Sequence, residues 1–460
     1  MARTGPIEAG EFGDLRLSAR HLRLIEMARE SPGSSFPEWV DSPSELESLY
    51  RFMSNESVTV EAMLEPHFRT TCDKSAGQQV LVLHDTTQFE FGGEVVREGL
   101  GPRGKSKRAD GFFGHFALAA SADVRRSCLG LLGFLSYVQA RKIRGRKVVE
   151  ARPKSAKWFE LIRQCEERAQ RPGDLVHVMD READDYALFA ALDRSEFRFI
   201  CRAKDRTVDG DDGAVGLREL LGSVEHSIER EVQLSPRAAE RSPVNRKHHP
   251  PRPSRPAQLR IRAHRVAVLR PKGRPRDSLP DQVELNAVQV YEPKPPTGQA
   301  PIDWLIMTNE PINTLEAIER IVDSYKARWL IEEYFKALKT GCSYERRQLE
   351  TLHGLLNALG LLAPIAVDLL RLRETARDNP NAPASEVISV GRLEVLRAIS
   401  HRHPLGPKPR AVDILLAVAG LGGHLKNNGH PGWLVLHRGF IRLLDAEAGW
   451  LASAQRGRKK

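Results

Sequence analysis

Four polar side chains between residues 313 and 341 have the types and spacing that could act on a phosphate group. The segment reads NTLEAIERIVDSYKARWLIEEYFKALKTG. On a helix that turns by about 100° per residue, one face collects Tyr325, Arg328, Glu332 and Lys339 within roughly 60°. A carboxylate flanked by cations suits a metal ligand that works beside phosphates. The same spacing also fits a solvated helix face stabilised by ion pairs, so the stripe alone leaves both interpretations open.

Two aspartates stand where short buried strands are predicted to end. Asp85 follows the apolar run VLVLH, and Asp180 closes the run DLVHVMD. Functional groups of α/β sheets collect at such strand ends, although an aspartate there can also form a turn or cap a helix. Together with Glu332, the two aspartates could hold two hard cations through oxygen ligands. One cation would activate water or a 3′ hydroxyl, and the other would stabilise the leaving oxygen.

The elements that must position these side chains alternate along the chain. Asn313 and Glu316 predict the start of one long helix, and Gly341 predicts its end. Apolar or β-branched runs predict strands at residues 80–91, 115–121, 128–138, 174–180, 197–204 and 303–309. Helices are expected at residues 155–170 and 182–192, and the first turn of the second would hold Glu182 and Asp184. Three successive strands followed by alternating helices and strands predict a mixed α/β sheet.

The flanking regions differ in character from this core. Residues 1–70 are expected to be helical, with arginines that fit DNA phosphates or simply a solvated surface. Residues 206–300 interrupt the alternation with two strand-like runs and a Pro-rich stretch, where residues 236–276 hold thirteen Lys or Arg against one acid. This pattern predicts an antiparallel β insertion that carries a mobile basic loop. The apolar run at 350–376 predicts a helix that is kinked or divided at Pro364.

Composition narrows the function classes. The 460 residues carry a formal charge of +10 and an estimated pI near 9.4, which favours a polyanionic partner. Five scattered cysteines without CxxC spacing, no apolar run of transmembrane length and no signal-peptide core predict a soluble cytoplasmic protein. Residues 99–106, GLGPRGKS, match a phosphate-loop pattern, but the residues that follow do not predict the required helix. A basic loop between strands is therefore expected there, and an NTPase is a third-ranked hypothesis.

Three motifs resemble the signatures of a known family. HDTT at 84–87, DREAD at 180–184 and YKARWLIEEYFKALKTG at 325–341 are similar to those of the insertion-sequence-four family of DDE transposases, in particular the transposon-five type of cut-and-paste enzyme. The resemblance implies an RNase H-like catalytic core at residues 71–345, including the β insertion. It also implies a helical DNA-binding domain at residues 1–70 and a helical dimerisation region at residues 346–460.

The resemblance also implies roles for individual residues. The acidic triad that would bind two Mg²⁺ ions, with Mn²⁺ as a substitute, is Asp85, Asp180 and Glu332. The residues that would grip DNA phosphates beside the cleaved end are Tyr325, Arg328 and Lys339. A flipped base would stack on Trp304, and further DNA contacts would come from Arg202, Lys204, Arg16 and Arg20. Leu330 and the Tyr334–Phe335 pair depart from the family pattern, which leaves the recognised end sequence open.

The expected activity is cut-and-paste DNA transposition. The chain would nick transposon ends, form and resolve DNA hairpins, and transfer the ends into target DNA. Its partners would be transposon-end and target double-stranded DNA and a second copy of the chain, with no membrane involved. A catalytically inactive protein that binds DNA ends and represses transposition is the alternative.

Overall fold

A computed structural model describes residues 8–93, 97–103, 106–138, 154–170, 173–210, 213–225, 227–237, 250–273, 278–425 and 430–457. The chain divides into two compact units. The first unit comprises Met1–Gln78, Thr86–Glu150 and Trp329–Lys460, and the second comprises Gln79–Asp85 and Ala151–Arg328. The boundary falls inside one strand, β1 (Val80–Phe91), and again between two short helices at Arg328.

The second unit is built on a mixed sheet. Its parallel part joins the first residues of β1 to β5 (Leu175–Met179) and then β5 to β6 (Arg198–Ala203). Antiparallel strands continue the sheet in the order β12, β11, β10, β7 and β8, with β9 also paired to β10. Their bounds are Asp303–Thr308, Gln282–Tyr291, Arg255–Leu269, Thr207–Gly210, Gly213–Gly216 and Ile228–Leu234. The mixed α/β sheet predicted from the sequence is confirmed, and it is consistent with an RNase H-like arrangement.

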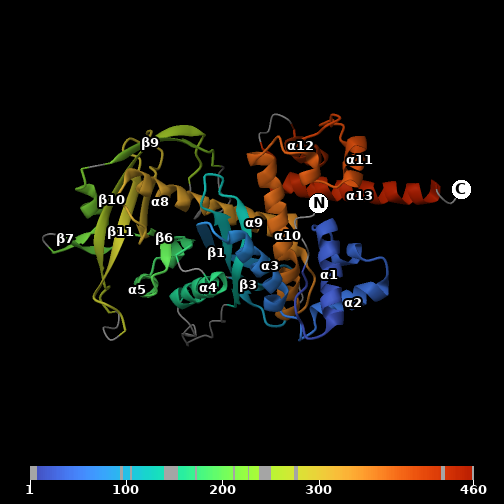
Figure 1. Ribbon diagram of the computed structural model, residues 1–460, viewed down its shortest axis with the longest axis horizontal. Helices are drawn as coiled ribbons and strands as arrows, with labels where there is room; N and C mark the ends of the chain where they lie inside the picture. The colour runs from blue at the N-terminus through green and yellow to red at the C-terminus, as the bar shows by residue number, and fades with distance from the viewer. Residues whose placement is uncertain are drawn as a thin grey trace. The chain divides into compact units, whose positions relative to one another are not determined.

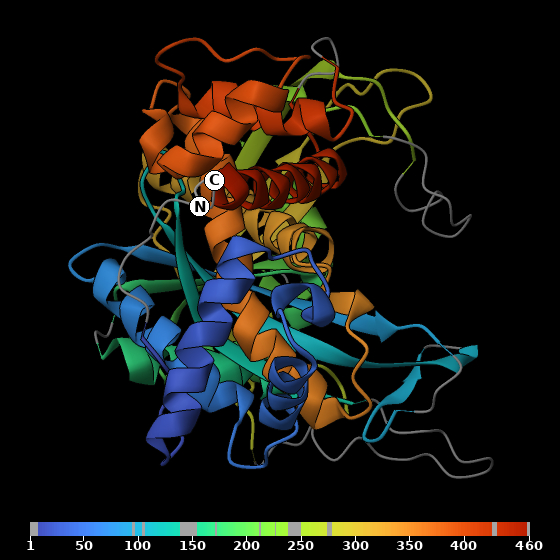
Figure 2. The same cartoon turned by 90° about the vertical axis from the view of Figure 1, so that its right-hand side faces the viewer.

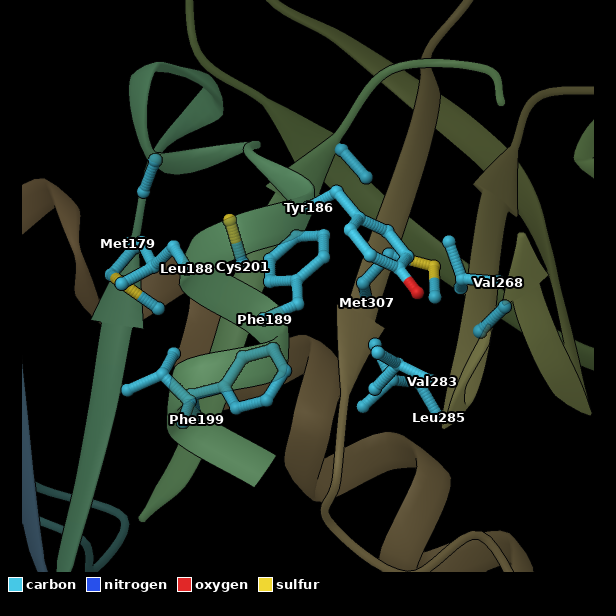
Figure 3. Packing of buried hydrophobic residues seen from close by; sticks show 14 of the residues in the cluster. Met179, Tyr186, Leu188, Phe189, Phe199, Cys201, Val268, Val283, Leu285 and Met307 are labelled. Carbon is cyan, nitrogen blue, oxygen red and sulfur yellow. The ribbon is translucent and has the colours of Figure 1, made fainter. Parts of the chain in front are cut away.

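One hydrophobic core joins the parallel strands to the antiparallel ones (Figure 3). Phe189 of α5 (Tyr186–Arg194) stacks on Phe199 of β6, with ring centroids 5.4 Å apart. The same cluster contains Val268 of β10 and Leu285 of β11, so the strands of residues 206–300 share this core. The described residues of this unit also form the helices α4 (Lys154–Ala169), α6 (Leu217–Gly222) and α8 (Leu315–Ala327). Of the stretch at 236–276 expected to carry a basic loop, residues 238–249 and 274–276 lie outside the described residues, and Arg255–Leu269 forms β10, which contains Pro256 and is not a loop.

The first unit combines four paired strands with several helices among the described residues. In it, β3 (Ser106–Ser121) pairs with β2 (Gly101–Arg103), with β4 (Cys128–Tyr137) and with β1. Helices α1 and α3 pack on α10, as Figures 1 and 2 show. The bounds of the helices are Leu15–Glu30 for α1, Pro43–Met53 for α2, Val60–Ser75 for α3, Trp329–Lys336 for α9, Leu352–Asp378 for α10, Val390–Ile399 for α11, Ala411–Leu421 for α12 and Trp433–Gly457 for α13.

The glycine-rich segment at residues 99–106 is followed by strand β3, which starts at Ser106. A phosphate loop needs a helix N-terminus directly after its glycines, because the backbone N–H groups there bind the phosphate. The expected absence of a helix after Ser106 agrees with this strand, but Gly101–Arg103 forms strand β2, so the segment is not a loop throughout. Lys105 itself lies outside the described residues.

The prediction of one long helix at residues 313–341 is wrong in its details. Its N-cap is Thr314, whose hydroxyl accepts a hydrogen bond from Ala317 N at 3.1 Å, and not Asn313. At Arg328 the backbone N–H bonds Tyr325 O, three residues back, and this tightened turn separates α8 from α9. A π-helical turn, Ala337–Gly341, then follows α9. A helical wheel with a single period therefore does not describe the positions of Tyr325, Arg328, Glu332 and Lys339.

Of the two alternatives at Pro364, division of the helix is wrong, because α10 continues as one helix through that residue, while a kink there stays a prediction. A proline inside a helix costs about 3 kcal/mol or more, and the burial of this apolar helix offsets that cost. Contrary to the expectation from the sequence, Leu352–Arg377 is long and apolar enough to cross a membrane by length and composition alone. Its most apolar window is 72% buried within the structure, which is typical of a core helix.

Candidate active site

Asp85 lies on β1, and Asp180 directly follows β5, the strand that pairs in parallel with β1. The register of β1 and β5 pairs Leu83 with Val178, an offset of 95 residues that also separates Asp85 from Asp180. Continuing that register by two residues places the two aspartates side by side, because neighbouring strands lie about 4.8 Å apart. An equal offset also puts both side chains on the same face of the sheet. The strands are buried as far as His84 and Met179, and both aspartates are half-buried.

Asp85 is held in an ion pair. The Arg328 Nη1 group donates a hydrogen bond to Asp85 Oδ2 at 2.7 Å, and each side chain is 15% exposed. Arg328 is placed there by the tightened turn that ends α8. Two members of the proposed site are thus in direct contact, and a guanidinium compensates the charge of one strand-end carboxylate.

Asp180 both stands at the end of a strand and caps a helix, the two positions that the sequence left open for it. It follows β5 directly, and its Oδ1 accepts a hydrogen bond from Glu182 N at 2.8 Å, which caps the short 3-10 helix Arg181–Ala183. Cys201 of β6 lies against it, with Sγ 3.5 Å from Asp180 O. Burial raises the pKa of the Cys201 thiol, and the Asp180 charge adds to that shift.

The remaining acids of the DREAD motif do not form the first turn of α5. Asp185 is the N-cap of that helix and accepts a hydrogen bond from Ala187 N at 2.9 Å. Asp184 instead accepts from the Lys204 backbone N at 2.9 Å and pairs with Arg206. The helix begins later than predicted because Asp185 is its cap. Asp184 therefore fixes the turn after β6, and the Lys204 side chain is exposed.

A buried chain of polar side chains lies one residue before Asp85. His84 Nε2 is 2.8 Å from His177 Nδ1, and His177 Nε2 is 3.0 Å from Glu166 Oε1. Both histidines are fully buried, and Glu166 comes from α4. The chain joins β1, β5 and α4 beside the two aspartates. The sequence reasoning missed it, although a histidine in each of two otherwise apolar strands is a signal that could have pointed to it.

A second group of predicted residues comes together around Arg202. Its guanidinium carbon lies 5.2 Å from the Trp304 ring and 5.9 Å from the Tyr325 ring, and the two rings meet edge to face at 5.5 Å. Arg202 Nη2 also donates to Asp303 O at 3.1 Å. Burial lowers the pKa of Arg202, and Tyr325 opposes that shift. Trp304 is half-buried on β12, so part of its ring is accessible.

The other two predicted site residues of the helical segment belong to the first unit. Glu332 lies half-buried on α9. Lys339 lies in the π turn, donates to Gln88 O at 2.5 Å and pairs with Glu345 at 3.4 Å. Since Asp85 and Asp180 belong to the second unit, the convergence of Glu332 with them stays a prediction.

The arginines of α1 differ in their surroundings. Arg16 is 91% exposed and pairs with Asp14 at 2.9 Å. Arg20 is half-buried, with Nη2 2.5 Å from Ser48 Oγ of α2, and it thereby joins α1 to α2. Arg16 is therefore the more accessible of the two for a DNA phosphate.

The donor set of the strand ends fits a hard divalent cation. Two aspartates on the same face of adjacent strands present carboxylate oxygens, the ligands that Mg²⁺ and Mn²⁺ accept. Among the described residues, no group of three or more His, Cys, Asp or Glu side chains is arranged to hold a metal ion. The two aspartates at the ends of these strands are therefore candidate ligands.

Two family models match the chain. The Transposase DNA-binding model matches residues 4–58, and the Transposase DDE domain model matches residues 153–367. The first range contains Arg16 and Arg20. The second contains Asp180 and Glu332, as well as Arg202, Trp304, Tyr325, Arg328 and Lys339. Asp85 lies outside both ranges, so its place in the site rests on the register of β1 and β5.

Proposed function

We propose that this chain, a DNA transposase with a DNA-binding domain and a DDE domain, moves its element by metal-dependent cut-and-paste transposition. It nicks transposon ends, forms and resolves DNA hairpins, and joins the ends to target DNA. In this proposal it belongs to the insertion-sequence-four family and resembles the transposon-five type. The family matches support the DNA transposase, and the cut-and-paste route rests on the three resembling motifs.

The observation that carries the proposal is the parallel pairing of β1 with β5, in which Asp85 and Asp180 each stand two residues beyond the last registered pair, Leu83 and Val178. These carboxylates and Glu332 would hold two Mg²⁺ ions, with Mn²⁺ as a substitute. Bound metal would supply activation of the attacking oxygen and stabilisation of the leaving oxygen. Phosphoryl transfer of this kind depends on positioning and charge neutralisation more than on a covalent nucleophile.

The basic residues would neutralise and orient the DNA backbone. Arg328 lies against Asp85, so a phosphate that reaches the site would meet both a carboxylate and a guanidinium. Tyr325 and Lys339 would contact neighbouring phosphates, and Arg202 and Lys204 would extend this basic surface. Arg16 and Arg20 would contact the transposon end from the N-terminal helices.

The flanking regions receive roles in the same proposal. Residues 1–70 would bind the transposon end, and residues 71–345 would form the RNase H-like catalytic core with its β insertion at 206–300. The C-terminal helices of residues 346–460 would pair two copies of the chain on DNA. Sedimentation of the purified chain with and without end DNA would test this pairing.

The decisive test of the function is cleavage of DNA that carries the ends of the element encoding the chain. The purified protein should nick such DNA when Mg²⁺ is added and leave it intact in EDTA. A chain that binds these ends tightly but never cleaves them, in Mg²⁺ or Mn²⁺, would be the repressor alternative.

Trp304→Ala should separate the two cleavage steps. The partly accessible indole, supported by Tyr325 and Arg202, would stack on a flipped base during hairpin formation. Base stacking on an aromatic ring is worth about 1–3 kcal/mol, so the rate of hairpin formation should fall about 5- to 150-fold while the first nick changes little. Trp304→Phe keeps a ring and should retain most of the hairpin product. Denaturing gels of end DNA measure both steps, and equal loss of nick and hairpin would contradict the stacking role.

A further inference from the structure

Glu333, the residue after Glu332, is bound by three side chains from three helices. Its Oε2 accepts a hydrogen bond from Trp433 Nε1 of α13 at 2.8 Å and pairs with Arg373 of α10. Its Oε1 accepts from Lys336 Nζ of α9 itself at 2.7 Å. The Arg373 guanidinium lies 5.0 Å from the Trp433 ring, and Trp433 is 8% exposed. These contacts form a closed polar cluster of Glu333, Lys336, Arg373 and Trp433.

The charge balance of this cluster favours an ionised Glu333. Two cationic side chains, Lys336 and Arg373, and one N–H donor, Trp433, contact its carboxylate. A carboxylate that accepts several charge-assisted hydrogen bonds has little freedom to rotate, because each bond prefers a narrow geometry.

Helix α9 needs such an external restraint. It has 8 residues, the tightened turn at Arg328 precedes it and the π turn Ala337–Gly341 follows it. A helix this short has little stability of its own. Its apolar side is buried through Ile331, Tyr334 and Phe335, which anchors one face. The Glu333 cluster adds directional bonds on another face, about 100° around the helix from Glu332.

We propose that Glu333 is a positioning residue, whose bonds to α10 and α13 set the rotation of α9 and thereby the direction in which Glu332 projects. This inference rests on the proposed function, in which Glu332 is a metal ligand. A misplacement of about 1 Å at a reacting group can cost about 100-fold in rate. Loss of the cluster therefore affects the chemical step more than DNA binding.

The test compares Glu333→Ala with Lys336→Ala, which removes the exposed partner and leaves both interhelical contacts in place. Three quantities are measured: the single-turnover nicking rate at saturating end DNA and Mg²⁺, the affinity for end DNA, and amide hydrogen exchange of α9. Glu333→Ala should lower the nicking rate about 100-fold, leave DNA affinity within about twofold and speed exchange in α9. Lys336→Ala should change the nicking rate by less than about threefold, because it breaks no bond between helices.

A milder variant keeps the inference testable if Glu333→Ala does not fold. Trp433→Phe removes only the indole N–H and keeps a ring beneath Arg373, and it should lower the nicking rate about tenfold, or ~1.4 kcal/mol. Faster exchange in α9 with an unchanged nicking rate in either variant would overturn the positioning role. An unchanged rate in Glu332→Ala would instead overturn the proposed function, so the two failures are distinguishable.

Discussion

Replacing Asp85 by Asn lowers the rate of end nicking by about 1000-fold or more, while the affinity for end DNA stays within about threefold. The substitution keeps the shape of the side chain but removes the charge that a hard cation requires. If the register of β1 and β5 continues two residues past Leu83 and Val178, this position lies beside Asp180, and β1 and β5 contain no other aspartate that could replace it. Gel assays of nicking in Mg²⁺ and filter binding of end DNA measure the two quantities.

Asp209→Asn is the matched control for this prediction. It makes the same chemical change in the same unit, at an exposed position of β7. Its nicking rate should equal that of the unchanged protein within about twofold, since exposed substitutions of this kind have small effects. Asp85→Asn also removes the contact with Arg328, so the melting temperature of both variants is recorded. Mg²⁺-dependent nicking that survives in a folded Asp85→Asn variant would exclude Asp85 from the site.

Arg328→Ala should change metal binding and catalysis in opposite directions. In the structure its guanidinium neutralises Asp85 at 2.7 Å, so a cation that binds the carboxylate must compete with it. Removing the guanidinium should therefore tighten Mn²⁺ binding in the absence of DNA, by about three- to tenfold. The nicking rate should nevertheless fall about 100-fold, because the phosphate loses a positive charge in the transition state.

Calorimetric titration with Mn²⁺ and single-turnover nicking separate these two effects of Arg328→Ala. Arg328→Lys retains the charge without the planar guanidinium. In both measurements its value should lie between those of the unchanged protein and Arg328→Ala. Arg265→Ala, at a 75% exposed position of β10, controls for loss of net charge. If Arg328→Ala binds Mn²⁺ more weakly than the unchanged protein, the guanidinium does not compete with the cation.

The strand ends of the site could be predicted from the sequence because their signal is local. An apolar, β-branched run followed by aspartate is visible in ten residues, and both runs are strands. The alignment of Asp85 with Asp180 depends on which strands pair and in what register. That pairing is decided by contacts across the chain, so the sequence indicated two strand-end aspartates without their adjacency.

The helical part of the site was harder to predict. A regular wheel from 313 to 341 assumes one period, whereas the hydrogen bond at Arg328 and the π turn after α9 each change it. The division predicted at Pro364 was wrong for a related reason. Local helix propensity carries no information about the burial that stabilises α10. The partners of Glu333 on other helices, Arg373 and Trp433, lie 40 and 100 positions away along the chain, and no local sequence pattern shows such contacts.

The central claim, that Asp85, Asp180 and Glu332 hold the catalytic metal together, is tested most directly by exchanging the ligand atom. Cysteine replaces each residue in turn, and nicking is measured in Mg²⁺ and in Mn²⁺. A thiolate is a poor ligand for Mg²⁺ and a better one for softer cations. The account predicts that all three variants are inactive in Mg²⁺ and regain at least about tenfold activity in Mn²⁺, while the corresponding alanine variants regain none. Full activity in Mg²⁺ for any one of the three cysteine variants would contradict the shared metal site.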